Sequence, residues 1–489
     1  MIMKKSSLAL GAIAVLVAAW AGGTWYSGKA LEQKYPEYIA LANERVTSGY
    51  NNVAHGNYHL EIKNTKLERG FFSTEIEDQV IITDLKDNSQ LILPFKSTAE
   101  HGPLPLSRLT SLKLMPVLAD AHSEMTEDPS ISEVFKASKG VAPYSGDFSI
   151  SYSGQIKQNS TIAAFDYSNE QFSINSTPIY IESDTNQEGV GLLKMRLEKW
   201  VSTLQANELN DQYQPITVNR TLTFNDVTLN SDLSPTDFKY VPSGKQRFDI
   251  GLISIVDEAA TDYSAQNVEL KNIRFDYDTN VSAQFADYRL NNSIEALSVN
   301  GENFGQIDFN LNLGHLAAAE LNQVVEAFTN PNLQQQQAQL NEAGLKLLQQ
   351  QPTLAIQPLK LKNSAGENQL TFDLAFSKAD QQAALMQGKI LSLFDKLEMN
   401  ANVNRQSAQM LMTSLAKLDD IENPEQYAES ELNQSLEDAV QQKVLVSNDN
   451  GANYQSKLIL ENGELKLNGE VIPEESIAQT LLFMFMGGF

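Results

Sequence analysis

The chain has 489 residues, of which 36 are Lys or Arg and 61 are Asp or Glu, so its formal net charge is −25. This acidic balance argues against a nucleic-acid-binding protein, which normally presents a basic face. Hydrophobic residues make up 42% of the sequence, which excludes wholesale disorder, and the mean hydropathy of −0.30 excludes a polytopic membrane protein. The absence of cysteine excludes disulfides, thiolate metal sites and a cysteine nucleophile.

The first predicted element is a membrane-spanning helix. Residues 6–28 contain no charged side chain, and 23 helical residues at about 1.5 Å each are long enough to cross a bilayer. Two lysines precede the run, so the positive-inside rule keeps the N-terminus in the cytoplasm and exports everything after residue 28. The predicted anchor residues are two apolar positions and an aromatic belt at the outer end: Leu8, Leu16, Trp20, Trp25 and Tyr26. The sequence therefore predicts a single-pass bacterial inner-membrane protein whose bulk lies in the periplasm.

The same run also has the features of a cleaved signal peptide. Its apolar region would be residues 8–19, and Ala19-Trp20-Ala21 has the A-x-A shape of a cleavage site. The anchor is favoured because the run continues past this site and ends in the aromatic belt. Both interpretations place most of the chain outside the cytoplasm.

Alternating apolar and polar residues predict β-strands through much of the exported part, each with one buried face. The pattern is clearest in four runs: residues 148–152, 273–277, 307–313 and 370–376. Asn462-Gly463 lies between two alternating runs, and this is the strongest short signal for a hairpin. Asn468-Gly469 predicts a further turn.

The second half of the chain also contains helical patterns. Residues 316–348 predict two amphipathic helices broken near Asn330-Pro331, because proline lacks a backbone donor and clashes with the preceding turn. A further helical block is expected over residues 379–420. Two apolar stripes at helical spacing support it: Ile390, Phe394 and Leu397, and then Leu411, Leu415 and Leu418.

The predicted fold class is α+β and β-rich, with an N-terminal transmembrane helix followed by an elongated, curved antiparallel-sheet domain with helical insertions in its second half. The expected segments are the anchor 1–28, a β-rich periplasmic region 29–315, a mainly helical insertion with intervening strands 316–420, and an acidic helix with a β-hairpin 421–489. The curled sheet either encloses a cavity suited to acyl chains or fills it with side chains. The apolar stretch 477–489 is too short to cross a bilayer, so it either docks on the core or contacts a partner or lipid.

Few residues indicate chemistry. His55 and His59 are four apart, but the alternation that follows predicts a strand, so both are expected at the surface. The candidate functional turn is His101-Gly102-Pro103, in which Gly and Pro would fix the imidazole either as a base or as a cap on a strand. Residues 419–438 carry eight acids and no base, which is typical of a solvated acidic helix. The usual nucleotide-binding and hydrolase motifs are absent, so we predict no catalytic residue, no cofactor and no metal site.

An ordered set of short motifs runs along nearly the whole chain. They are W-Y-S-G-K at 25–29, R-G-F-F-S at 69–73, H-G-P-L-P-L at 101–106, G-Q-I-D-F at 305–309 and L-K-L-N-G at 465–469. Together they resemble the YdgA-like family of gammaproteobacterial proteins. The resemblance implies an inner-membrane-anchored, exported protein with no assigned catalysis, and a homodimer. The chain is also distantly similar to the AsmA-like envelope proteins, whose folded sheets form lipid-conducting grooves, which is an architectural analogy.

Two functional hypotheses follow from these patterns. The first is a non-enzymatic envelope protein that binds a partner protein, a second copy of itself, or an amphipathic lipid along an apolar groove. The alternative is a periplasmic hydrolase of envelope material, with His101 or clustered acids in its site. A homodimer through the helices of 316–348 and 379–420 is expected, and no nucleic-acid partner is expected.

Overall fold

The computed structural model describes residues 3–47, 57–210, 212–258, 267–328, 333–378, 383–384 and 387–473, and within these ranges it does not describe the side chains of residues 3–17, 45 and 333. The chain divides into two compact units. Unit 1 comprises Met1–Asn169, Ser173–Glu198 and Phe328–Leu333, and unit 2 comprises Glu170–Phe172, Lys199–Ala327 and Gln334–Phe489. The boundary between them falls inside a strand, and the domain segments expected from the sequence stay a prediction.

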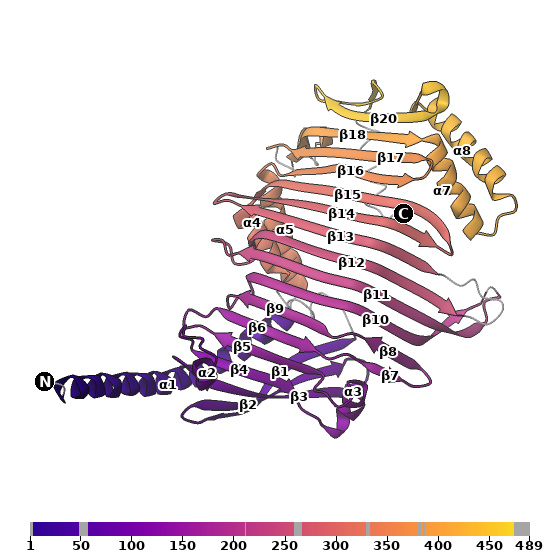
Figure 1. Cartoon of the computed structure of the whole chain (residues 1–489). Helices are drawn as coiled ribbons and strands as arrows, with labels where there is room; N and C mark the ends of the chain where they lie inside the picture. The colour runs from indigo at the N-terminus through magenta and orange to yellow at the C-terminus, as the bar shows by residue number, and fades with distance from the viewer. Residues whose placement is uncertain are drawn as a thin grey trace. The chain divides into compact units, whose positions relative to one another are not determined.

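The sheet of unit 1 is antiparallel throughout. Its strands pair in the order β1–β2–β3–β4–β5–β6–β9–β10, and β7 pairs with β8 (Figure 1). The elements are α1 (Met3–Val46), β1 (Tyr58–Arg69), β2 (Ser73–Asp84), β3 (Gln90–His101), α2 (Leu106–Thr110), β4 (Ala119–Met125), the 3-10 turn η2 (Pro129–Ile131), α3 (Ser132–Ala137), β5 (Tyr144–Ile150), β6 (Ile156–Ile162), β7 (Asp166–Ser168), β8 (Phe172–Ser176), β9 (Ile179–Thr185) and β10 (Gly191–Leu209).

Helix α1 covers part of one face of this sheet. Leu31 is buried against Ile76 of β2, Ala99 of β3 and Ala119 of β4. The two alanines leave room for the helix to approach the strands closely. Burying a leucine side chain in this way stabilises the contact by about 1.5–3 kcal/mol.

Polar side chains fasten the second half of α1 to the same sheet. The amide of Asn43 pairs with the backbone of Ile62 in both directions, each at 2.7 Å, and so satisfies one free position of the edge strand β1. The hydroxyl of Tyr35 bonds the carboxylate of Asp78, and burial together with that carboxylate raises the pKa of Tyr35. The helix is therefore an integral part of unit 1.

The predicted membrane anchor lies at the start of α1, and the helix projects from unit 1 at that end (Figure 1). Leu8 and Leu16 belong to the helix, but their side chains are outside the description. Across the part of the chain that the structure describes, no helix combines the length and the apolar character that a membrane crossing requires. Membrane anchoring stays a prediction.

Unit 2 is built on a second run of antiparallel pairings. The order is β11–β12–β13–β14–β15–β16–β17–β18–β20–β21–β22, and β19 also pairs with β20 (Figure 1). The elements are β11 (Pro215–Ser234), β12 (Ser243–Glu258), β13 (Val268–Val281), β14 (Phe285–Val299), β15 (Glu302–Ala317), α4 (Ala318–Ala327), α5 (Leu333–Gln349), β16 (Thr353–Asn363), β17 (Gly366–Phe376), the 3-10 turn η3 (Ile390–Leu393), β18 (Phe394–Asn404), α7 (Arg405–Leu418), α8 (Pro424–Gln441), β19 (Val446–Asn448), the 3-10 turn η4 (Asp449–Gly451), β20 (Asn453–Glu461), β21 (Glu464–Leu467) and β22 (Glu470–Ile472).

The pairing register of unit 2 sorts side chains into an apolar face and a polar face. Two rows of register partners define the apolar face: Leu229, Phe248, Phe275, Asn292, Phe309, Leu359 and Leu370, and then Tyr277, Leu290, Leu311, Ile356, Phe372, Met399 and Leu458. One row defines the polar face: Asp249, Arg274, Ser293, Asp308, Lys360, Gln369 and Asn402. Neighbouring residues of a strand point to opposite sides, so the sheet is amphipathic across its width.

In unit 2, the alternation of apolar and polar side chains is interrupted at one register position that crosses the neighbouring strands β11, β12 and β13. Asp226 and Asn272 have positive φ angles of 53° and 50°, and Gly251 lies between them in register. A Cβ on Gly251 would be 3.0 Å from the Cβ of Asp226, so the strands need a glycine there. Across this position, successive apolar residues of one strand are three residues apart instead of two, as Ile250 and Ile253 are.

The β-rich, antiparallel part of the predicted fold class is confirmed. Residues 273–277, 307–313 and 370–376 lie in β13, β15 and β17, whereas β5 ends at Ile150, two residues before the predicted end of its run. The two-residue turn Asn462-Gly463 joins β20 to β21, with φ angles of 55° and 80°. Asn468-Gly469 joins β21 to β22 in the same way, with 49° and 87°. Positive φ at both central residues is what a type I′ hairpin turn requires.

The helical predictions are confirmed except for one. α4 and α5 are the two expected helices, and the break at Asn330-Pro331 lies outside the described residues. The Leu411 stripe lies in α7, and the acidic segment lies in α8 from Pro424 onward, with Asp419, Asp420 and Glu422 before the helix. The stripe that begins at Ile390 is wrong, because residues 390–393 form η3 and Phe394–Asn404 is strand β18. Pairing with β17 on one side and β20 on the other outweighed the helical spacing, which competed with an equally good period of two.

Candidate functional site

The predicted functional turn lies beneath helix α1. His101 ends β3 and is 1% exposed. Its Nδ1 donates to the carbonyl of Phe71 at 3.1 Å, so its Nε2 accepts from the hydroxyl of Thr74 at 2.7 Å. Burial lowers the pKa of His101 and keeps the imidazole neutral. Both ring nitrogens are engaged, an arrangement that suits a cap on the sheet and not a base.

The turn fits closely against small residues of α1. A Cβ on Gly28 would lie 2.4 Å from His101 Nδ1, and a Cβ on Gly23 would lie 2.7 Å from Pro103 Cδ. Within the turn, a Cβ on Gly102 would lie 1.6 Å from the carbonyl oxygen of Val117. We call His101, Gly102 and Pro103 the helix socket. Side chains as small as a methyl group are too large at these contacts.

The sequence contained an overlooked signal for this docking. Gly23 and Ser27 are four apart, as are Thr24 and Gly28, so α1 carries a stripe of small residues on one face. Such stripes let another backbone approach a helix closely. Thr24 and Ser27 are buried, and each of their hydroxyls donates to the helix carbonyl four residues earlier.

The aromatic residues of the predicted anchor have different environments. Trp20 Nε1 donates to the carbonyl of Leu104 at 2.9 Å, so this ring is held by unit 1. Trp25 and Tyr26 are exposed on the other side of the helix. The hydroxyl of Ser27 contacts that of Tyr152 at 2.6 Å. Residues 20–28 of the predicted span are thus in contact with the folded unit.

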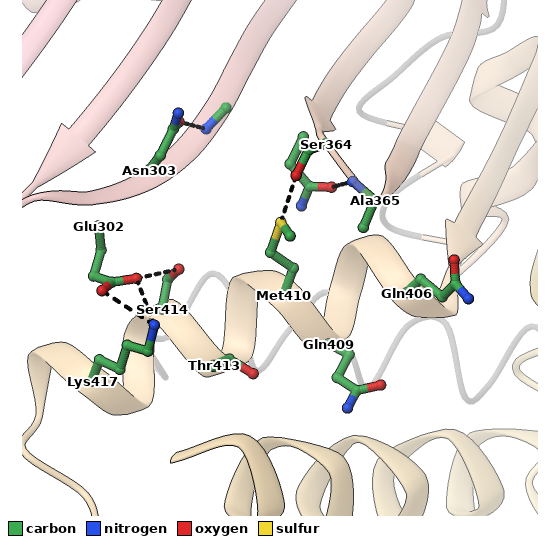
Figure 2. A pocket seen from close by; sticks show the side chains of 12 residues that line it. Glu302, Asn303, Ser364, Ala365, Gln406, Gln409, Met410, Thr413, Ser414 and Lys417 are labelled. Carbon is green, nitrogen blue, oxygen red and sulfur yellow. Dashed lines mark hydrogen bonds and ion pairs between the residues drawn. The ribbon is translucent and has the colours of Figure 1, made fainter.

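A groove with a volume of about 500 Å³ runs beside α7 in unit 2 (Figure 2). Glu302 of β15 accepts from the Ser414 hydroxyl at 3.1 Å, and Lys417 Nζ lies 3.3 Å from the same carboxylate. Ser364 Oγ lies 3.4 Å from the sulfur of Met410. Ser414 donates to a carboxylate that an ammonium already neutralises, so this serine is not activated as a nucleophile. These contacts hold α7 against β15 and the β16–β17 turn.

The polar face of unit 2 contains two adjoining cavities, of about 270 and 680 Å³, which share Arg274, Ser293 and Asp308. Arg274 Nε bonds Asp249 at 2.7 Å across neighbouring strands. No cluster of metal-ligating side chains occurs in the described ranges of the chain. The polar face is a ladder of cross-strand charge pairs of the kind that stabilises sheets modestly.

The apolar face of unit 2 is only partly covered. Every residue of β17 is partly exposed. This holds for the apolar Leu370, Phe372 and Leu374 as well as for the polar Thr371 and Asp373. Leu359 of β16 is 37% exposed. If this face packed on a second layer, every second side chain along the strand would be buried. The expectation of one buried face is therefore wrong for β17.

Helices border the apolar face at both ends of its strands. At one end, Leu321 of α4 and Leu347 of α5 pack against a buried cluster that contains Ala286 of β14 and Leu316 of β15. At the other end, the amide of Asn368, which alternates in phase with Leu370, donates to Ser407 of α7 at 2.9 Å. α4 and α5 lie at one side of the strands and α7 and α8 at the other (Figure 1). The partly exposed apolar face is therefore bordered by helices at both ends of its strands.

The remaining candidates from the sequence do not belong to the two apolar rows. His59 is exposed in β1, and His55 falls outside the described residues, as does the apolar stretch 477–489. All eight acids of residues 419–438 are exposed. The alternation of consecutive strands predicted an apolar groove for a lipid as one alternative, but none of the residues in the two apolar rows was predicted as a site residue.

Comparisons with known proteins identify the family. A family model described as "Bacterial protein of unknown function (DUF945)" matches residues 3–475. The chain is 24% identical to Protein YdgA of Escherichia coli (strain K12), over 96% of this chain and 95% of that protein. It is 25% identical to an uncharacterized protein of Haemophilus influenzae, over 66% of this chain and 85% of that protein, and 21% identical to the uncharacterized protein YihF of E. coli, over 96% and 97%. No solved structure matches the chain. Because the match covers nearly its whole length, the chain belongs to the DUF945 family of bacterial proteins of unknown function, in agreement with the resemblance to the YdgA-like family.

Proposed function

We propose that the protein is a non-enzymatic envelope protein, anchored in the bacterial inner membrane through residues 6–28, that binds an amphipathic lipid in the periplasm. The lipid's acyl chains would lie on the apolar face of unit 2. The observation that carries this proposal is the partial exposure of every residue of β17, although its side chains alternate between apolar and polar. A closed core would protect the apolar half of them.

The size and chemistry of the apolar face suit acyl chains. Each row crosses seven neighbouring strands, from β11 to β17 or from β13 to β20, and six spacings of about 4.8 Å give it a length of roughly 29 Å. Covering apolar surface with a lipid releases about 25 cal/mol per Å² removed from water. The two rows consist almost entirely of Leu, Ile, Phe, Met and Tyr, with Asn292 as the exception. Such a face favours flexible apolar ligands over charged ones.

Native mass spectrometry on the full chain, purified in mild detergent, tests the proposal. We expect wild-type protein to carry a phospholipid mass that is released on denaturation. Phe372→Asp places a charge on the apolar face, whereas Thr371→Asp places one next to it on the polar face of the same strand. The first variant should lose the lipid and the second should keep it. Lipid-free wild-type protein, or equal retention by both variants, would refute the proposal.

A periplasmic hydrolase gains no support from the geometry. His101, the base considered for it, is buried with both ring nitrogens bonded, and Ser414 is bonded to a carboxylate paired with Lys417. The homodimer through residues 316–348 and 379–420 stays part of the proposal. Sedimentation of the full chain in detergent at micromolar concentration tests it, and a monomer under those conditions would remove it.

A further inference from the structure

Unit 1 exposes a group of large apolar side chains near the point where α1 leaves it. We call the group the collar: Phe71, Phe72, Leu106, Leu109, Leu112, Leu114 and Met115. Leu112 is 82% exposed and Met115 is 75% exposed. Single exposed apolar residues are ordinary, but a contiguous set on one loop system marks an interaction surface.

The fold brings the collar together at one end of the sheet. Phe71 and Phe72 form the turn between β1 and β2, and the other members lie between β3 and β4. In the antiparallel order β1–β2–β3–β4, both connections lie at the same end of the strands. The backbone NH of Val117 donates to the carbonyl of Pro103 at 3.0 Å and closes the base of the longer loop.

The collar is in direct contact with α1. The rings of Phe71 and Phe72 meet edge to face at 4.9 Å between centroids, and Phe72 stacks on Trp20 at 5.9 Å. Trp20, Phe72 and Leu106 line one small cavity of about 170 Å³. The helix socket fastens this end of the sheet to Gly23 and Gly28 of the helix. The position of the collar along α1 is therefore set by the fold.

The length of α1 beyond this contact is the central observation. Trp20 contacts the sheet end through the carbonyl of Leu104, and residues 6–19 of the uncharged run precede it in the helix. Fourteen helical residues span about 21 Å, whereas the hydrocarbon core of a bilayer is about 30 Å thick. If unit 1 stayed at the membrane surface, these 14 residues would be too short to cross the hydrocarbon core. The charged residues that precede them would then lie inside the lipid, or the lipid beside the helix end would be left unfilled. Sinking the collar into the interface removes the mismatch.

The charge of the collar loop fits a lipid surface. Residues 102–118 include Arg108 and Lys113 and no acidic residue, in a chain with a net charge of −25. Arg108 pairs with Asp120 at 3.2 Å, and Lys113 is exposed between Leu112 and Leu114. Apolar side chains flanking a lysine are the composition of segments that lie in the headgroup region of anionic membranes.

We propose that the collar inserts into the interfacial layer of the bilayer that α1 spans, so that unit 1 rests on lipid. This inference depends on the proposed membrane anchoring, and it adds a second, peripheral contact of defined residues. Its occupant is the lipid surface itself, because the collar contacts an apolar helix where that helix leaves unit 1 and carries Lys113, whose charge anionic headgroups attract.

Site-specific fluorescence tests the inference, and the absence of native cysteine makes the labelling unambiguous. Leu112→Cys and Met115→Cys place an environment-sensitive probe in the collar of the full chain. Leu85→Cys is the matched control, because Leu85 is also exposed and apolar but lies just after β2, at the opposite end of the same sheet. Each labelled chain is reconstituted into vesicles of phosphatidylethanolamine and phosphatidylglycerol, with and without a nitroxide-labelled lipid.

We expect both collar probes to shift to shorter emission wavelength and to be quenched several-fold more strongly than the Leu85→Cys probe. Flotation of the vesicles is recorded for every variant. If the chains float but all three probes are quenched alike, the collar inference is overturned while the anchoring stands. If the chains do not float, the anchoring itself is refuted and the collar inference with it. A blue shift that depends on protein concentration without vesicles would identify a second copy as the occupant and would also overturn the inference.

Discussion

Unit 1 and unit 2 are both built on antiparallel sheets, but they differ in how their apolar faces are covered. In unit 1, α1 crosses the sheet at two small residues, Ala99 and Ala119, and Leu31 is buried there against them and Ile76. In unit 2, the corresponding rows are made mainly of Phe, Leu and Ile, and the described helices border the face at the strand ends. Alanines on neighbouring strands let a helix pack on the sheet at short distance, whereas large side chains hold a neighbouring element further away and leave apolar surface exposed.

The largest expected effect is a difference in stability between the same substitution, leucine to alanine, made in each of the two units. Leu31→Ala removes a buried side chain of unit 1, and we expect it to lower the free energy of unfolding by about 2–5 kcal/mol. Leu359→Ala acts on the partly exposed face of unit 2 and should lower it by less than about 1 kcal/mol. Urea unfolding of the full chain in detergent measures both. Equal losses would show that the two faces are equally buried and would contradict the comparison.

The close fit of α1 in the helix socket provides the second test. Gly28→Ala adds a methyl group 2.4 Å from His101, and we expect it to lower the free energy of unfolding by about 1–3 kcal/mol. Gly22→Ala is the control, because nothing lies within 4 Å of its Cβ and alanine favours the helix by up to about 1 kcal/mol. The free energy of unfolding should fall only for Gly28→Ala. Unfolding is followed by tryptophan fluorescence, to which Trp20, Trp25 and Trp200 contribute. Stabilisation by both substitutions would mean that α1 does not dock here.

The stability of unit 1 should depend on pH through His101. Burial lowers the pKa of His101 in the folded state, so the unfolded chain takes up the proton first as the pH falls. The contribution is complete above the ordinary histidine pKa of about 6.5 and is lost as the pH drops from there through the lowered folded value. The loss is at most about 1.4 kcal/mol per pH unit.

Urea unfolding between pH 7.5 and 5 measures this dependence. His101→Gln should flatten the profile, whereas His59→Gln, at an exposed position of β1, should leave it as in the wild type. A profile that His101→Gln leaves unchanged would show that the imidazole is accessible to protons in the folded protein. Unit 2 has no histidine in an equivalent socket among its described residues, since His315 is exposed and stacks on Phe285.

The smallest expected effect concerns one polar residue in the apolar rows of unit 2. Asn292 lies in register between Phe275 and Phe309, and its side-chain oxygen is buried without a hydrogen-bond partner among the described residues. Asn292→Leu removes this unsatisfied acceptor and should stabilise the protein by about 0.5–1 kcal/mol. Asn291→Leu, on the polar face, should not. A loss of stability in Asn292→Leu would mean that the amide is satisfied in solution.

Local patterns predicted the elements well where local physics decides them. The hairpin at Asn462-Gly463 follows from residues that tolerate positive φ, and β13, β15 and β17 follow from strict alternation. The helix predicted from Ile390 failed because its apolar residues fit two periods, and the choice was made by the neighbouring strands β17 and β20. The turn at His101 was recognised, but its partner was not, because Gly28 lies 73 positions away in the chain.

By itself, the sequence determined the acidic, β-rich character of this protein, the charge-free run of residues 6–28 and most of the strands and helices. These properties follow from composition and from the periods of backbone geometry, which are local. Only the tertiary structure decided which apolar faces are covered. Whether Leu31 or Phe372 is shielded depends on which distant element can approach, and this depends on the size of the side chains opposite: alanine beneath α1, and Phe, Leu and Met around β17.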